Sequence, residues 1–215
     1  MSADLKMLES IQNTQSISRE ELGAILQTQD SFLIQELHKK AQQTAIQIYG
    51  NKIYIRGLIE YTNYCKNNCY YCGIRCANAK ADRYRLTTEQ ILSCCETGWN
   101  LGFRTFVLQG GEDPYYTDVK ICQIVQEIKS KYPNCAVTLS IGEKSEESYQ
   151  AYFNAGADRY LLRHETADEE HYRKLHPQQM SLNNRKNCLK VLKKIGYQTG
   201  CGFMVGSPGQ TVDTL

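Results

Sequence analysis

The chain has 215 residues, 41% of them apolar, and its 25 basic and 23 acidic side chains give a formal net charge of +2. This length can build a hydrophobic core without disulfides, and the near-neutral charge gives no general reason to expect a nucleic-acid partner. No apolar run approaches the roughly 18–20 residues of a membrane helix, and the first ten residues lack the apolar core of a secretory signal. We therefore expect a cytoplasmic protein with no nucleic-acid or membrane partner.

Residues 1–48 are predicted to form a segment of short helices. Ser18 to Glu21 has the form of a capping box, in which two side chains satisfy free backbone N–H groups at a helix start. Polar residues near positions 16 and 28–30 divide the segment. Apolar residues recur at helical spacing at Ile25, Phe32, Leu33, Leu37 and Ala41.

From residue 49 onwards, strand-like runs alternate with amphipathic helices. A glycine follows a helix and precedes a strand at Gly102, Gly156 and Gly196, where each is predicted to be a left-handed helix cap. Alternating strands and helices indicate a parallel sheet, because parallel strands need a crossover connection. The five strands are expected at residues 53–61, 104–109, 135–141, 159–165 and 197–206.

The predicted fold is an α/β parallel (β/α) barrel of TIM type, incomplete, with about five βα units over residues 49–215. A full eight-stranded barrel typically needs about 250 residues. We expect the chain to lack roughly the C-terminal third of such a barrel. Its first and fifth strands would then be open sheet edges, which favour association.

Ten cysteines are the unusual feature of the composition, and three of them cluster. Cys65, Cys69 and Cys72 follow the first strand with the spacing C-x3-C-x2-C. Thiolates favour zinc, copper(I) or iron–sulfur clusters, and a structural zinc normally takes four ligands. Cys76 extends the run and leaves open a closed zinc site or a four-cysteine cluster. Disulfides are less expected in a reducing compartment.

The motif C-x3-C-x-aromatic-C after the first strand of a βα series resembles that of radical S-adenosylmethionine (SAM) enzymes. Within them, the chain is similar to the HydE-type maturases of FeFe hydrogenase. Biotin synthase and the methylornithine synthase of pyrrolysine assembly share the cysteine motif but fit the other segments less well. The segments that carry the resemblance are YCKNNCYYCGIR, DRYRLT, LQGGEDPYY, VTLSIGE, GADRYLLRHETA, YRKLHP and VGSPGQT.

The resemblance implies a 4Fe–4S cluster on Cys65, Cys69 and Cys72, with one iron left for the amino and carboxylate groups of SAM. It implies reductive cleavage of SAM to methionine and a 5′-deoxyadenosyl radical. The implied partners are a small-molecule or small iron-complex substrate, an electron donor such as ferredoxin or flavodoxin, and other hydrogenase maturation proteins. Cys76 lies outside the family motif.

The resemblance also assigns the polar residues at the strand ends. Adenine would be contacted by Tyr71 and Met204. The methionine amino group of SAM would meet an exposed backbone at Gly110, Gly111 and Glu112. SAM would also be bound by Ser140 and Glu165, and its carboxylate would pair with Arg185. Gln109, Thr138 and Arg163 would face the substrate, and an arginine in an apolar barrel suggests an anionic one.

Simpler interpretations remain for several of these residues. The glycines could form a plain turn, Arg185 could be a solvated helix charge and Met204 could be a core residue. His164 is interpreted as packing, and His171 and His176 as surface or helix-end residues. For the whole chain, another biotin synthase-like radical SAM enzyme and a catalytically inactive metal-binding fragment are the alternatives.

Overall fold

The computed structural model describes residues 3–215, which separate into two compact units. One contains the residues up to Tyr54 together with Thr211–Asp213, and the other contains Ile55–Gln210 and Thr214–Leu215. The first unit is helical, as predicted. Its helices are α1 (Ala3–Thr14), α2 (Arg19–Gln27) and α3 (Ser31–Tyr49).

Helix α2 begins with the predicted capping box. The Ser18 side chain accepts a hydrogen bond from the backbone N–H of Glu21, and the Glu21 carboxylate accepts one from the backbone N–H of Ser18 at 2.8 Å. Such a pair satisfies donors that the first helical turn leaves free. Among residues 3–215, no helix combines the length and the apolar character needed to cross a bilayer.

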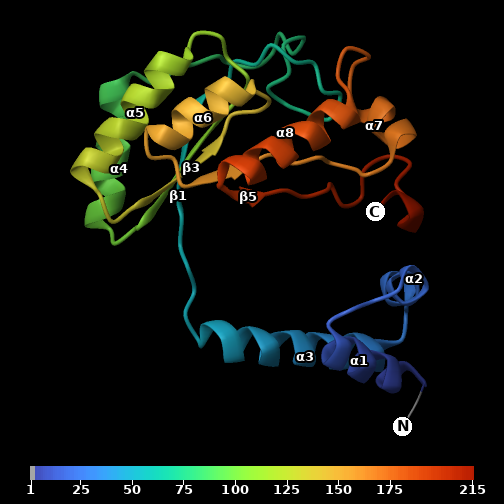
Figure 1. The fold of residues 1–215 in the computed structure, drawn as a ribbon. Helices are drawn as coiled ribbons and strands as arrows, with labels where there is room; N and C mark the ends of the chain where they lie inside the picture. Colours follow the sequence, from blue (N-terminus) through green and yellow to red (C-terminus); the bar gives the residue numbers. More distant parts are fainter. Residues whose placement is uncertain (1–2) are drawn as a thin grey trace. The chain divides into compact units, whose positions relative to one another are not determined.

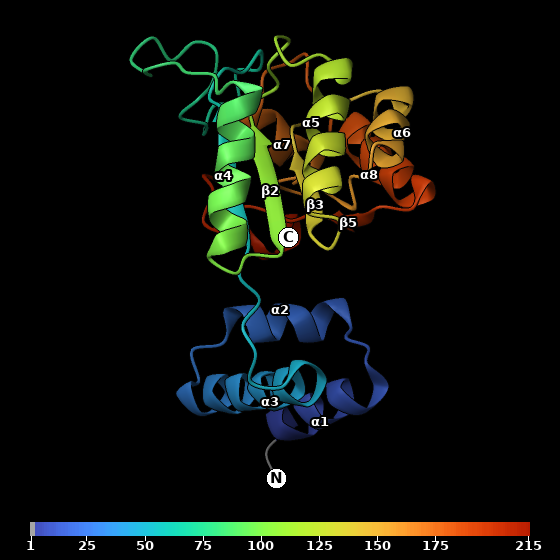
Figure 2. The same cartoon turned by 90° about the vertical axis from the view of Figure 1, so that its left-hand side faces the viewer.

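The second unit is built on a single sheet of five parallel strands, ordered as they occur in the chain. Figures 1 and 2 show four helices along one side of this sheet, α4, α5, α6 and α8. This α/β arrangement is the predicted wall of five βα units. The strands are β1 (Gly57–Thr62), β2 (Thr105–Gly110), β3 (Ala136–Ser140), β4 (Arg159–Leu161) and β5 (Gln198–Gly200), and the helices are α4 (Thr88–Asn100), α5 (Asp118–Lys131), α6 (Glu146–Asn154), α7 (Glu169–Leu175) and α8 (Leu182–Ile195), with a 3₁₀ turn at Val212–Thr214.

The two faces of the sheet differ because side chains alternate along a strand. One face packs against the helices and forms the hydrophobic core, with Phe106, Leu108, Val137, Leu139 and Tyr160 at most 1% exposed. The opposite face is more open, with Leu58 of β1 55% exposed. The predicted caps are confirmed at their left-handed φ values, which are 91° for Gly102, 110° for Gly156 and 113° for Gly196.

Several predicted strand boundaries are wrong. The first strand begins at Gly57 and not at residue 53, because its neighbour β2 begins only at Thr105 and Gly57 already pairs with Phe106. The preceding apolar residues have no sheet partner, and Ile53 is 88% exposed. The fourth and fifth strands each end after three residues, and beyond them the two segments are joined by an isolated bridge between Glu165 and Phe203 and by single backbone hydrogen bonds.

The corrected start of β1 separates two isoleucines that the sequence placed in one strand. Replacing Ile59, which is 6% exposed, by Ala should lower the free energy of unfolding by about 2–5 kcal/mol. The matched change at Ile55, which is 66% exposed, should alter it by less than about 0.5 kcal/mol. Chemical denaturation of both variants checks this, and equal losses would contradict the assigned boundary.

Candidate active site

The cysteine loop follows β1 directly, at the carboxyl end of the sheet. Cys65, Cys69 and Cys72 are half-buried, whereas Cys76 is exposed. Burial, together with the neighbouring thiols of Cys65 and Cys72, raises the pKa of Cys69 to about 11. Burial also raises the pKa of Cys65, while backbone N–H groups of Asn67 and Glu112 lower it by hydrogen bonding to its sulfur. The three predicted ligands therefore lie within electrostatic reach of one another.

The three thiols are a donor set that suits zinc or an iron–sulfur cluster. Among residues 3–215, no three His, Cys, Asp or Glu side chains converge as the ligands of one metal ion would. A 4Fe–4S cluster is different, because its thiolates bind separate iron atoms around a larger centre. Half-buried thiols that repel one another as anions would be stabilised by the positive charge of such a centre.

Arg83 stabilises the conformation of the cysteine loop through hydrogen bonds to its backbone. Its guanidinium donates hydrogen bonds to backbone carbonyl groups on both sides of the cysteines. The acceptors are the carbonyl oxygens of Asn63, Ile74 at 2.9 Å, Arg75 at 2.7 Å and Asn78 at 3.2 Å. An arginine can do this because it carries five donors in a fixed fork and keeps its charge. In the sequence, Arg83 is visible only as part of the motif DRYRLT, which does not reveal these contacts.

Arg85 ties the same region to the segment after β2. Its guanidinium binds the Asp113 carboxylate through two contacts, 2.7 Å from Nε and 2.9 Å from Nη2, and stacks over the Tyr64 ring at 3.8 Å. Thr62 donates to the same carboxylate at 2.8 Å. Burial works to raise the pKa of Asp113, but the hydrogen bonds from Arg85, the backbone of Tyr115 and Thr62 together outweigh it and hold the pKa below its usual range. The loop is therefore fixed by an ion pair between the exposed Arg85 and the buried carboxylate of Asp113.

Gly110 and Gly111 let the end of β2 approach the cysteine loop closely. A Cβ at Gly111 would lie 2.2 Å from the carbonyl oxygen of Tyr64 and 2.6 Å from the Cβ of Cys65, and one at Gly110 would lie 2.7 Å from the Thr62 side chain. Neither glycine has a positive φ. The plain-turn interpretation is therefore wrong, since close packing and not unusual backbone geometry requires glycine here.

The expectation of an exposed backbone is met only in part at this segment. Gly110 lines a cavity, but Gly111 and Glu112 are buried. The carbonyl of Glu112 accepts the backbone N–H of Lys66 at 3.0 Å, and its carboxylate accepts the backbone N–H of Glu143 at 2.9 Å. These contacts arise because the cysteine loop folds over the end of β2.

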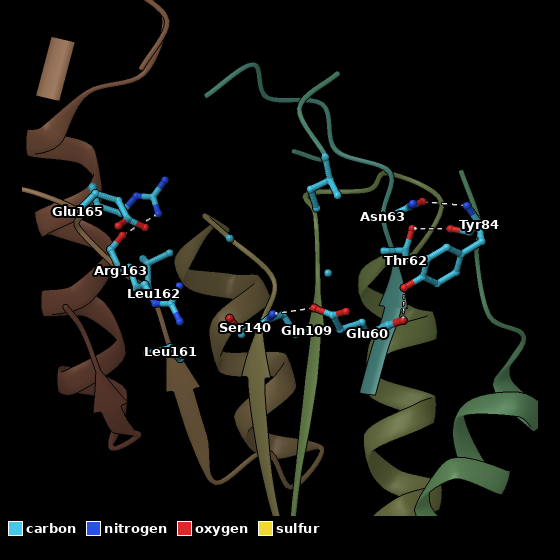
Figure 3. Close-up of a pocket in the computed structure, with 14 residues that line it drawn as sticks. Glu60, Thr62, Asn63, Tyr84, Gln109, Ser140, Leu161, Leu162, Arg163 and Glu165 are labelled. Atoms are coloured by element: carbon cyan, nitrogen blue, oxygen red, sulfur yellow. Dashed lines mark hydrogen bonds between the residues drawn. The ribbon is translucent and has the colours of Figure 1, made fainter. Parts of the chain in front are cut away.

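A cavity of about 250 Å³ lies at the carboxyl ends of the strands. Figure 3 shows side chains from β1, β2, β3 and the end of β4 around it, including Gln109 and Glu60, whose side chains are 3.2 Å apart. Six predicted residues line it, namely Gln109, Gly110, Ser140, Arg163, Glu165 and Arg185. The sequence missed Glu60, Thr62, Asn63 and Tyr84, which line it as well. For Glu60, Thr62 and Asn63, the available signal was a polar side chain at the end of an apolar strand.

Arg185 is buried, so its interpretation as a solvated helix charge is wrong. Only 9% of the residue is exposed, its Nε lies 2.6 Å from the Glu143 carboxylate, and it donates to the carbonyl of Arg163 at 3.0 Å. Burial works to lower the pKa of Arg185, and the carboxylate of Glu143 more than compensates. The cavity therefore contains a permanently charged guanidinium with donors of defined direction.

Glu165 adopts a backbone conformation that non-glycine residues rarely take, with φ at 67°. It is held there by the fifth strand's extension, since its N–H donates to the carbonyl of Gly202 at 3.0 Å and its carbonyl accepts from Met204 at 2.9 Å. Burial raises the pKa of this carboxyl, while Arg163 and Arg185 act in the opposite direction. Strained residues of this kind concentrate at functional sites.

Besides the cysteines, Gly111 and Glu112, three further predicted site residues lie outside the cavity lining. Thr138 is two residues deeper than Ser140 on the same face of β3, and it is 8% exposed. The backbone of Met204 is bonded to Glu165, as described above, and the residue is half-buried. Tyr71 places its hydroxyl 3.1 Å from Nε2 of His176. The structure therefore brings the strand-end residues together around the cavity but leaves Thr138, Met204 and Tyr71 outside its lining.

Of the two interpretations of His171 and His176, the surface position is wrong, whereas His176 does lie at a helix end, as the C-cap of α7. The two histidines are 1% and 2% exposed. His171 lies 3.0 Å from the Thr166 hydroxyl and 3.1 Å from the carbonyl oxygen of Pro208. The reason is that α7 packs beneath the cysteine loop, where Tyr70 donates its N–H to the carbonyl of Leu175 at 2.9 Å. His164 is half-buried.

Comparison with known proteins agrees with this geometry. Residues 59–215 match the model of the radical SAM superfamily. The chain belongs to this superfamily. The matched region begins within β1 and includes the cysteine loop, the sheet and the cavity. Members of this class are iron–sulfur, SAM-dependent enzymes, in agreement with the resemblance found in the sequence.

Individual relatives narrow the similarity. The chain is 45% identical to the [FeFe] hydrogenase maturase subunit HydE of Thermotoga maritima over 210 residues, and 30% identical to the 3-methylornithine synthase of Methanosarcina acetivorans over 212 residues. Each match covers 98% of this chain and 59% of the relative. The chain therefore spans about three fifths of the length of these curated relatives.

Solved structures show the same fold. The crystal structure of methylornithine synthase (PylB) matches with a TM-score of 0.88 and 28% identity, covering 96% of this chain and 60% of that one. HydG, a maturase of the [FeFe]-hydrogenase, matches with a TM-score of 0.84 and 28% identity, covering 94% and 46%. The predicted fold class and the predicted similarity to HydE-type proteins are confirmed.

The close approach at Gly111 can be tested with a matched pair of glycines. Gly111→Ala should destabilise the protein by about 1–3 kcal/mol, because backbone atoms of the cysteine loop would have to move. Gly73→Ala, in the same loop with no atom within 4 Å of its new Cβ, should change stability by less than about 0.5 kcal/mol. Denaturant titration measures both, and a neutral Gly111→Ala would contradict the packing described here.

Proposed function

We propose that this chain carries the catalytic core of a HydE-type radical SAM enzyme that acts in maturation of the FeFe-hydrogenase active-site cluster. The single observation that carries the proposal is the arrangement of three half-buried thiols on a loop fixed at the carboxyl end of a parallel sheet. The 45% identity to HydE of Thermotoga maritima favours the maturation role. A cytoplasmic location remains our expectation from the sequence.

Cys65, Cys69 and Cys72 would hold a 4Fe–4S cluster. When bound, this group supplies the open iron and the electron for reductive cleavage of SAM to methionine and the 5′-deoxyadenosyl radical. The protein has to position SAM and to keep water and stray hydrogen donors away. A loop tied down by Arg83 and Arg85 suits this task, because its ligands keep their places before the cluster arrives.

The cavity side chains divide into two groups in this proposal. Ser140, Glu165 and Arg185 would bind SAM. The guanidinium of Arg185 is held in place by Glu143, and its fork of donors suits the carboxylate of SAM. The carboxylate of Glu165, a residue with a positive φ, would accept hydrogen bonds from the ribose or from the methionine end of SAM. The backbone of Gly110 remains available at the same rim. Tyr71 and Met204 would contact adenine once SAM is bound.

Gln109 and Arg163 would face the substrate, with Thr138 deeper on the same inner surface. Gln109 and Arg163 line the cavity from β2 and from the segment after β4. A cationic side chain on this inner surface favours an anionic small molecule or a small iron complex. The electron would come from a carrier protein such as ferredoxin or flavodoxin, and other hydrogenase maturation proteins would deliver the substrate or receive the product.

A second candidate is the chemistry of 3-methylornithine synthase, which is favoured by the 30% identity and the TM-score of 0.88 to a solved methylornithine synthase. A search for 3-methylornithine among the products of the reconstituted protein distinguishes the two, since formation of 3-methylornithine would favour the synthase. Restoration of hydrogenase activity in a strain that lacks its HydE would favour the maturase.

The proposal predicts a clear difference among four neighbouring cysteines. After anaerobic reconstitution with iron and sulfide, the protein should be brown and should release 5′-deoxyadenosine from SAM when reduced. Replacing Cys65, Cys69 or Cys72 by Ala should abolish the colour and the SAM cleavage, because each removes a ligand. Iron analysis, visible absorption and product chromatography measure this.

Cys76→Ala is the matched control and should retain both the colour and the cleavage. A colourless wild-type protein that contains stoichiometric zinc would contradict the proposal. Loss of the cluster on replacement of Cys76 would contradict the assignment of a three-cysteine site. An inactive metal-binding fragment would bind iron and yet leave SAM intact.

A further inference from the structure

The aromatic residue of the cysteine motif is held by a histidine that lies outside the motif. Tyr71 stands between the predicted cluster ligands Cys69 and Cys72, and its hydroxyl lies 3.1 Å from Nε2 of His176. The tyrosine ring meets the imidazole edge-on, with the ring centroids 5.3 Å apart. Tyr71 is otherwise open, since 40% of the residue is exposed. The contact with His176 is therefore the polar anchor of this side chain.

The hydrogen bonds of His176 define which of its two ring nitrogens carries the proton. Nδ1 lies 3.0 Å from the carbonyl oxygen of Tyr172, and because a carbonyl oxygen can only accept, Nδ1 is the donor. Burial and the positive charge of Arg185 outweigh the opposing effect of the Tyr172 carbonyl and lower the pKa of His176 to about 4, so the ring is neutral at pH 7. Nε2 of the neutral ring has a lone pair and accepts the hydroxyl proton of Tyr71. The direction of this hydrogen bond is therefore fixed.

The imidazole of His176 has little freedom to move. It is 2% exposed and stacks on the ring of Tyr172, with the centroids 3.8 Å apart and the planes 15° from parallel. As the C-cap of α7, His176 also donates its backbone N–H to the carbonyl of Tyr172. One residue earlier, the carbonyl of Leu175 accepts the N–H of Tyr70 at 2.9 Å. Two successive residues at the end of α7 thus bind two successive residues of the cysteine loop.

We propose that His176 is a positioning residue that sets the orientation of the Tyr71 ring for the adenine of SAM. The proposal rests on the proposed function, in which Tyr71 contacts adenine. His176 does not touch SAM itself, because its ring is buried and both of its ring nitrogens are engaged. It acts through Tyr71, whose backbone is set by the flanking cysteines and whose hydroxyl is set by the histidine. A ring that is already oriented loses less conformational freedom when a ligand binds, which favours tighter binding.

Nitrogen NMR of the four histidines tests the hydrogen bond without any cofactor. In the full chain labelled with ¹⁵N-histidine, His176 should show a protonated Nδ1 and an unprotonated Nε2 at pH 7. Tyr71→Phe removes the donor and should shift the Nε2 resonance of His176. Tyr70→Phe is the matched control and should leave this resonance in place, since the contacts of Tyr70 to Leu175 and Arg75 are made by its backbone. A protonated Nε2, or one that does not respond to Tyr71→Phe, would overturn the proposal.

Binding of SAM to the reconstituted protein tests the positioning role. His176→Phe keeps a flat ring on Tyr172 but removes the acceptor, and it should weaken SAM binding roughly two- to tenfold and raise KM with a smaller change in kcat. His176→Gln supplies an amide oxygen as acceptor and should recover most of the loss, which a purely structural role of the imidazole would not produce. Tyr71→Phe should lose as much as His176→Phe. The double variant should lose no more than either, because the two side chains act through one hydrogen bond.

The outcomes separate this proposal from the proposed function. Wild-type SAM affinity in His176→Phe, a His176→Gln variant as weak as His176→Phe, or additive losses in the double variant would overturn the positioning role. Iron content and far-UV circular dichroism show whether each variant is folded and loaded. If His176→Phe is not, equal SAM affinities of Tyr71→Phe and Tyr70→Phe would overturn the proposal. Failure of the reconstituted wild type to bind SAM would instead overturn the proposed function, and the positioning role with it, whatever the NMR spectra show.

Discussion

The contact between the end of β2 and the cysteine loop is the constraint on which the rest of the site depends. A Cβ at Gly111 would lie 2.2 Å from a backbone oxygen of that loop, so only hydrogen fits there. This contact places Cys65 against the sheet and lets the backbone N–H of Glu112 reach its sulfur. The position of the cysteine loop relative to the cavity is thereby set by backbone packing, which is stiffer than side-chain contacts.

Two arginines, Arg83 and Arg85, also hold the cysteine loop in place. Arg83 donates hydrogen bonds to backbone carbonyl groups of the cysteine loop, which has almost no regular secondary structure. Arg85 joins the same loop to Asp113, on the segment after β2. A loop that curls around a large inorganic group cannot satisfy its own backbone, and buried carbonyl groups without partners are costly. Permanently charged side chains with several donors solve this problem without occupying the centre of the loop.

The sequence predicted much of this arrangement, for identifiable reasons. Alternation of apolar runs and amphipathic helices is a local signal, and it placed all five strands and the three glycine caps. Strand lengths were overestimated at residues 53–56 and after β4 and β5, because pairing depends on where a neighbouring strand begins, which no local pattern records. The three cysteines were found from motif spacing, Gln109, Ser140, Arg163 and Glu165 from their places at strand ends, and Gly110 and Arg185 through the family resemblance. Arg83, Glu60 and the buried histidines were missed, because their roles arise from contacts between distant segments.

The central claim is that three cysteines hold a 4Fe–4S cluster whose fourth iron binds SAM. The most direct measurement is electron paramagnetic resonance of the reduced, reconstituted protein in the presence of SAM labelled with ¹⁵N at its amino group. The account predicts that SAM changes the shape of the signal and that the label produces a hyperfine coupling, because the nitrogen becomes an iron ligand. A signal that is unchanged by SAM and free of nitrogen coupling would contradict it.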